Sequence, residues 1–227
     1  MGENPGVNPD ARLCRTIDWT DLKFAFIVGA VTTTLKLIGQ AKPEWQLNAV
    51  DALVAFLLTL GYIIARARRQ PEKLDEWGIT TPLNLPAVAA GLVLLAIAVG
   101  SQAAYGIALT GRLDFEPAYA PRMVEYIVGA FPQQFFMCSV GLVFLTKIRA
   151  FRGMWRIPLA VGLVFSLAHF WTPARIPGTI IPIQMVLVFP AGFAAAWYFL
   201  RFRSILPLAA IHAIGYVLLH NWVEMHL

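Results

Sequence analysis

Residues 123–146 read MVEYIVGAFPQQFFMCSVGLVFLT, an apolar run with the length of a membrane-spanning helix. Two adjacent glutamines, Gln133 and Gln134, interrupt the run, and Pro132 stands just before them. A primary amide in hydrocarbon has two N–H donors and an acceptor oxygen, and leaving them without partners costs free energy. The glutamine pair therefore predicts a polar site that faces protein rather than lipid.

The rest of the chain has the composition of an integral membrane protein. Of its 227 residues, 58% are hydrophobic and only 14% are charged, whereas a soluble domain carries about 25% charged residues. Six further apolar runs lie at about 21–40, 48–66, 84–108, 156–172, 180–200 and 204–223. We expect an all-α, polytopic membrane helix bundle of about seven transmembrane helices. It would form a single domain over residues 21–227, preceded by a polar N-terminal tail at 1–20.

The basic residues alternate between the two sides of this expected bundle. Thirteen Lys and Arg residues lie in the segments on the side of the N-terminus, and four lie in the loops on the other side. Because basic loops stay in the cytoplasm, this pattern predicts an N-in, C-out orientation, and we expect a bacterial plasma membrane. Topology thus explains the charge, so we expect a lipid bilayer around the chain and no nucleic-acid partner.

Polar side chains in the later runs suggest where chemistry takes place. His169 shares a helical face with Phe165, and His212 shares one with Tyr216, because each pair is four residues apart. Two histidines on different helices, together with the glutamines on a third, indicate one group of residues that faces the bundle interior. Asp51 lies near the outer end of the second run, and we interpret it as structural.

The chemistry of this group depends on what the glutamines supply. Two neutral imidazoles, those of His169 and His212, are candidate ligands of a divalent metal such as zinc and candidate general bases. Hydrolysis by a metal-activated water also needs a carboxylate. Gln133 and Gln134 supply amides, which neither exchange protons near neutral pH nor bind zinc well. The residue types therefore favour a site without a metal.

The order and spacing of these residues resemble the motifs of the CAAX-protease and bacteriocin-processing (CPBP) family of intramembrane endopeptidases. The second motif of that family, F-x-x-x-H, is intact here as Phe165 to His169. The third, H-x-x-x-N or H-x-x-x-D, keeps its histidine as His212 but has Tyr216 at the position of the Asn or Asp. The resemblance covers about residues 70–220.

The first motif of the family departs most from the pattern. It reads E-E-x-x-x-R in the family and aligns here with Gln133, Gln134 and Cys138, so both glutamates and the arginine are replaced. The resemblance implies that a glutamate of this motif and the histidine of the second activate a water molecule. It implies that the third motif stabilises the oxyanion or binds a metal.

These family roles can be transferred to the residues of this chain. His169 and His212 keep catalytic positions, Tyr216 remains able to donate a hydrogen bond to an oxyanion, and Gln133 or Gln134 replaces the catalytic carboxylate. Losing a general base typically costs a factor of about 10²–10⁴ in rate. We expect a protease homologue with impaired catalysis whose cavity binds a membrane segment or a protein partner.

Other functions stay open at this point, and so does the question whether the chain is an enzyme. An active intramembrane metalloendopeptidase would recruit its carboxylate elsewhere, from Glu125 or Glu224. A small transporter would use the polar residues to line a path between proline-broken helices, although no inverted repeat is visible. A third alternative is purely structural, with the glutamines bonding across helices.

Overall fold

The computed structural model describes residues 18–42, 47–113, 117, 120–151, 155–170 and 179–222, and all elements assigned there are helices. Most of the N-terminal tail lies outside these ranges, as does Glu224. Five helices among the described residues are long and apolar enough to cross a membrane: Trp19–Gly39, Val50–Arg69, Leu85–Ala108, Ala120–Lys147 and Met185–Phe202. The predicted all-α membrane fold is confirmed at this level.

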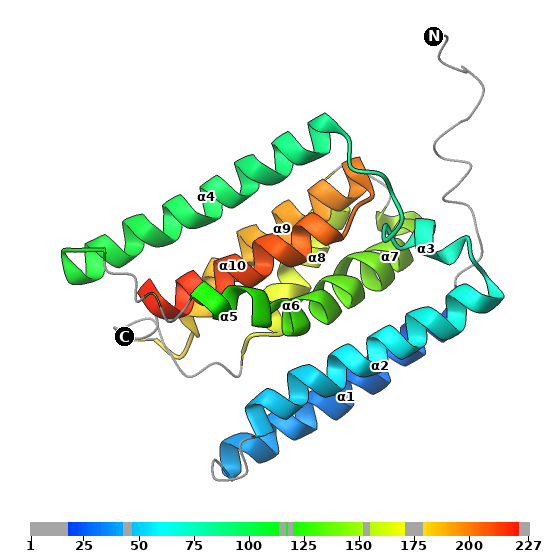
Figure 1. The fold of residues 1–227 in the computed structure, drawn as a ribbon, viewed down its shortest axis with the longest axis horizontal. Coiled ribbons are helices and arrows are strands. Elements are labelled where there is room, and N and C mark those ends of the chain that lie inside the picture. Colours follow the sequence, from blue (N-terminus) through cyan, green and yellow to red (C-terminus); the bar gives the residue numbers. More distant parts are fainter. Residues whose placement is uncertain are drawn as a thin grey trace.

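The helices lie side by side around one central helix (Figure 1). A hairpin of α1 and α2 borders one side of the bundle, and α4 borders the opposite side. The central span Ala120–Lys147 is 56% buried, against 11% for each of the spans in α1, α2 and α4. The glutamine pair therefore belongs to the span with the largest buried share, although only Gln134 is buried and Gln133 is exposed. The bounds of the long helices are α1 Trp19–Ala41, α2 Leu47–Arg69, α4 Leu85–Thr110, α8 Arg156–Leu167, α9 Ile183–Phe202 and α10 Leu206–Trp222.

The central helix changes its geometry along its length. Its first two parts, α5 (Ala120–Glu125) and α6 (Ile127–Gln134), are separated by a turn at Tyr126. A π-helical segment, η4 (Phe135–Leu142), follows directly and leads into α7 (Val143–Lys147). Pro132 lies inside α6 and lacks the N–H that an α-helix needs at that position. π-Helical turns occur frequently at functional sites. The change to π-helical geometry just after the glutamines therefore indicates a functional site in this part of the central helix.

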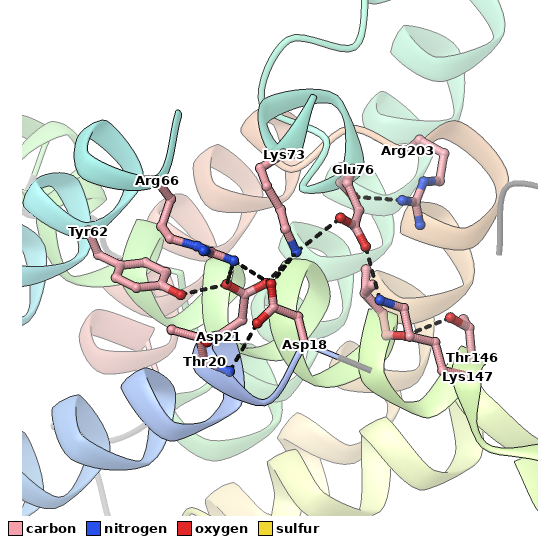
Figure 2. Close-up of polar contacts among 11 residues, drawn as sticks. Asp18, Thr20, Asp21, Tyr62, Arg66, Lys73, Glu76, Thr146, Lys147 and Arg203 are labelled. Carbon is pink, nitrogen blue, oxygen red and sulfur yellow. Dashed lines mark hydrogen bonds and ion pairs between the residues drawn. The ribbon is translucent and has the colours of Figure 1, made fainter. Parts of the chain in front are cut away.

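A network of charged side chains joins several helices at one end of the bundle (Figure 2). Its centre is Lys73 of the short helix α3 (Lys73–Glu76), a buried residue. The Lys73 ammonium lies 2.8 Å from Asp21, 3.1 Å from Asp18 and 3.1 Å from Glu76. Arg66 at the end of α2 also pairs with Asp18. The network thereby ties α3 to both helices of the hairpin.

The same network reaches the central helix and the corner between α9 and α10. Lys147 at the end of α7 lies 3.2 Å from the carboxylate of Glu76. Arg203 follows α9 and donates a hydrogen bond to the Glu76 carbonyl oxygen at 2.6 Å. Four other parts of the chain thus meet around α3: α1, α2, α7 and the corner between α9 and α10.

The loop after α3 packs into the core rather than onto the membrane surface. Tryptophan is common at membrane interfaces, yet Trp77 is 0% exposed, and its carbonyl oxygen accepts a hydrogen bond from the Ser139 hydroxyl at 2.6 Å. Gly78 has a φ of +71°, and a Cβ there would lie 2.5 Å from the Arg203 carbonyl oxygen. A residue with a side chain would not fit, so this glycine permits the close approach.

Helices α8 and α9 are in close contact through two glycines. A Cβ on Gly162 would lie 2.9 Å from the Phe189 carbonyl oxygen, and a Cβ on Gly192 would lie 3.0 Å from the Phe165 Cβ. Small residues let membrane helices approach closely in this way. The contact fixes Phe165, which lies one turn before His169.

Each of the seven predicted apolar runs coincides with a described helix or set of helices. Two of them are shorter than the runs suggest, because α8 has 12 residues and α10 has 17. A helix that crosses a bilayer needs about 20 residues. By length and composition, five helices of the described chain therefore qualify as spans.

Candidate functional site

Gln134 is buried at the end of α6, with 3% of its surface exposed. Its amide nitrogen Nε2 donates a hydrogen bond to Nδ1 of His212 at 2.8 Å. Its amide oxygen Oε1 accepts a hydrogen bond from the Cys138 thiol at 3.8 Å. Both ends of the amide have protein partners, which explains how this polar group is accommodated within an apolar span.

Gln133 makes a separate set of contacts, since neighbouring residues of a helix point in different directions. Its side chain is hydrogen-bonded to Tyr126, which is also hydrogen-bonded to Tyr216. The two tyrosine rings stack, with centroids 3.9 Å apart and planes 4° from parallel. The stacked pair connects the turn between α5 and α6 to α10.

His169 follows the last turn of α8, and its Nδ1 donates a hydrogen bond to the Phe165 carbonyl oxygen at 2.8 Å. The Phe165 ring contacts both histidines edge to face, with centroid distances of 4.9 Å to His169 and 5.9 Å to His212. The two imidazoles are close enough to interact electrostatically. Phe165 therefore links His169, which follows the end of α8, to His212 within α10.

Contacts connect all five of the predicted site residues, which come from α6, α8 and α10. The side chains of Gln134, His212 and His169 form one part of this arrangement, and Gln133 with Tyr216 forms the other. Sequence reasoning missed Tyr126, which joins the two parts because its ring also lies 6.3 Å from that of His212. Tyr126 precedes Gln133 by seven residues, a spacing that places both on one helix face.

The part of the chain that carries the site is similar to a known protein family. Residues 121–218 match the model of the family described as Rce1-like, the type II CAAX prenyl endopeptidases. This region belongs to the Rce1-like family. The curated proteins and the solved structures give no significant match. The predicted family resemblance is thus confirmed over residues 121–218, and the Rce1-like region contains every residue of the predicted site.

The helices outside the Rce1-like region also contribute charged groups near the site. The carboxylate of Asp51 in α2 accepts a hydrogen bond from the Ala52 backbone N–H at 2.7 Å. It also interacts electrostatically with Lys36 of α1 and with Tyr126, and Lys36 interacts with His169. The sequence indicated Asp51 only as a structural acid. The one sequence signal for these contacts was that Asp51 and Lys36 carry opposite charges in neighbouring apolar runs.

The structure describes only one of the two other acids that the sequence offered as a replacement carboxylate. Glu125 ends α5 and is exposed. Glu224 lies outside the described residues.

The residues of this site do not fit the catalytic zinc that an intramembrane metalloprotease would use. Such a zinc has three protein ligands from His, Asp, Glu or Cys. Over the described part of the chain, no three residues of these types lie close enough to hold a metal ion. His212 accepts a hydrogen bond from Gln134 at Nδ1, and the other polar side chains of the site are amides, phenols and the Cys138 thiol.

Proposed function

We propose that this Rce1-like protein binds a membrane-embedded peptide segment without hydrolysing it. The observation that carries the proposal is the hydrogen bond from the Gln134 amide to Nδ1 of His212. The family pattern has a glutamate at this position, and a carboxylate can take and release a proton. An amide cannot, so the arrangement retains the polar shape of the site without a general base.

The proposal includes a place in the membrane. The chain would cross a bacterial plasma membrane seven times, with its N-terminus inside and its C-terminus outside. Local thinning of the bilayer accommodates the shorter helices α8 and α10. The charged network supports this orientation, because it gathers Arg66, Lys73 and Lys147 at one end of the bundle. Gln134 lies 13 residues before Lys147, which is roughly 20 Å along a helix.

The proposed partners are the lipid bilayer and a membrane-associated peptide or protein, and binding needs no metal. A segment that enters the site would have to expose its main-chain groups, since folded helices satisfy them internally. Tyr216 and Tyr126 offer phenol groups to such a segment, and His169 and His212 offer ring nitrogens.

Purified full-length protein in proteoliposomes tests this function. The probe is a fluorescent, prenylated CAAX peptide, chosen because the family is described as prenyl endopeptidases. We expect saturable binding and an uncleaved peptide by mass spectrometry. Binding should weaken at least tenfold in Tyr216→Phe and His212→Leu, and it should be unchanged in Ser101→Ala, an exposed position of α4. Rapid cleavage by the unmodified protein would refute the proposal.

An active endopeptidase is the second candidate, and the position of Asp51 is the observation that favours it. Asp51 supplies a carboxylate that interacts with Tyr126, although the first motif has none. If the unmodified protein cleaves the peptide, this candidate expects Asp51→Asn to abolish cleavage. The exposed Glu125→Gln serves as the matched control and should cleave normally.

A further inference from the structure

The hydrogen bond to His212 determines which of its ring nitrogens carries the proton. The Gln134 Nε2 atom can only donate, so Nδ1 of His212 must accept the bond at 2.8 Å. A neutral imidazole has one N–H and one lone pair. The proton of neutral His212 therefore resides on Nε2, and that nitrogen is a donor.

This assignment depends on the orientation of the Gln134 amide, and Cys138 supplies that orientation. The thiol of Cys138 donates to Oε1 of Gln134 at 3.8 Å, and both residues are buried. Turning the amide over would replace this bond by one from the amide NH₂ to the Cys138 sulfur, which is a weaker acceptor than an amide oxygen. Cys138 replaces the arginine of the family motif, so two substitutions together fix the direction of the amide.

His169 has the opposite arrangement. Its Nδ1 faces the carbonyl oxygen of Phe165 at 2.8 Å, and a carbonyl oxygen can only accept. The proton of neutral His169 therefore resides on Nδ1, and its lone pair is on Nε2.

We propose that the site holds His169 and His212 in opposite tautomers and thus binds an uncharged amide, such as a peptide bond, in place of a divalent metal. One imidazole Nε2 would accept from the amide N–H of the ligand, and the other would donate to its carbonyl oxygen. A metal needs a lone pair on each ligating nitrogen, and His212 Nε2 has none in this tautomer. The choice of a peptide amide as ligand rests on the function proposed above, but the tautomers do not.

The replacement of the motif glutamate by Gln134 explains why the proton of neutral His212 resides on Nε2 and not on Nδ1. A carboxylate at position 134 would accept from Nδ1–H of His212 and leave the lone pair on Nε2, as in metal sites whose histidines are backed by carboxylates. One exchange of a carboxylate for an amide therefore converts a metal-binding nitrogen into a donor.

Nitrogen NMR of the full-length protein in lipid nanodiscs, labelled with ¹⁵N-histidine, reports the tautomers directly. Assignment uses His220→Gln and the single His169 and His212 variants. We expect His212 to give a protonated Nε2 and an unprotonated Nδ1, and His169 to give the reverse. In Gln134→Glu, the His212 proton should move to Nδ1. If that variant does not fold, Gln134→Met removes the amide at similar length, and His212 should then show both tautomers.

Zinc alone is the second probe, with protein purified through a tag that contains no histidine. We expect no stoichiometric Zn²⁺ binding by the unmodified protein in calorimetry and measurable binding by Gln134→Glu. Cys138→Ser retains a donor beside Oε1 and should leave the tautomers unchanged, which makes it the matched control.

Two results would overturn the inference. One is a protonated Nδ1 on His212 in the unmodified protein, and the other is stoichiometric zinc binding that His212→Gln removes. Peptide cleavage together with the expected tautomers would refute the proposed function and leave the inference standing. Reversed tautomers without peptide cleavage would refute the inference and leave the proposed function standing.

Discussion

Single atoms decide what the site can do at the scale of residues. Gln134 and the glutamate of the family pattern have nearly the same shape, yet one carboxylate oxygen becomes an NH₂ group. That group donates to His212, and the thiol of Cys138 supports the exchange from the other end of the amide. The substitutions at positions 134 and 138 are therefore chemically consistent with each other.

Asp18 gives a prediction about pH at the same scale. Burial raises the pKa of its carboxyl group, but the hydrogen bond to Lys73 and the charges of Lys73 and Arg66 outweigh this and lower the pKa from 3.8 to about 2. A carboxyl whose pKa is lower in the folded state stabilises the fold above the unfolded pKa. That stabilisation is lost as the pH falls from 3.8 towards about 2.

We therefore expect the unfolding temperature of the detergent-solubilised protein to fall over this acidic range. Asp18→Asn should lower stability near neutral pH, by on the order of 1–3 kcal/mol for hydrogen bonds to charged groups, and should flatten the acidic decline. The exposed Glu72→Gln is the control and should retain the full decline. An unchanged pH profile in Asp18→Asn would contradict this role.

The sequence identified the motif residues but not their neighbours. Gln133, Gln134 and the two histidines were recognisable from residue type and order along the chain. Tyr126 and Lys36 were not, because their roles depend on contacts between helices far apart in sequence. The tautomers were equally hidden, since the bond between Gln134 and His212 spans 78 positions.

At the scale of elements, hydrophobic runs predicted the helices well because a membrane helix needs only length and apolar composition. The interruptions were less visible. Proline is the residue that most often breaks a helix, yet Pro132 lies inside α6, the break lies at Tyr126 and the π-helical segment follows Gln134. Such details depend on how neighbouring helices pack against the central one.

The contact between α8 and α9 gives a prediction at this scale. In Gly192→Ala, the new Cβ would lie 3.0 Å from the Phe165 Cβ and 3.1 Å from the Gly162 Cα. Neither neighbouring atom lies at the flexible end of a side chain. We therefore expect overpacking to lower the free energy of unfolding by about 1–3 kcal/mol. Thermal unfolding in detergent measures it, and the His169 NMR signal should shift because Phe165 moves.

The matched control for the contact between α8 and α9 is Gly100→Ala in α4. A Cβ at Gly100 meets nothing within 4 Å, and alanine favours the helix by about 0.5–1 kcal/mol. Equal stability of the two variants would contradict the close contact.

At the scale of the whole molecule, the charged network joins the Rce1-like region to helices outside it. Lys147 belongs to the Rce1-like region, whereas Asp18, Asp21 and Lys73 belong to the preceding part of the chain, and Glu76 bridges them. Removing one member of a buried ion pair leaves the other charge uncompensated and lowers the stability of the fold. The network therefore connects the first hairpin to the Rce1-like region, and the hairpin also holds Lys36 and Asp51, which interact with His169 and Tyr126.

The orientation of this unit in the membrane is open to a direct test. The positive-inside rule places residue 72, beside the basic end of α2, in the cytoplasm and residue 113, beyond α4, outside. Both Glu72 and Leu113 are exposed, and replacing either with cysteine changes no Lys or Arg. In a background of Cys14→Ser and Cys138→Ser, a membrane-impermeant maleimide applied to intact bacterial cells should label Leu113→Cys. It should label Glu72→Cys only after the membrane is opened. The reverse pattern would invert the topology, and labelling of both from one side would show that α4 does not cross the membrane.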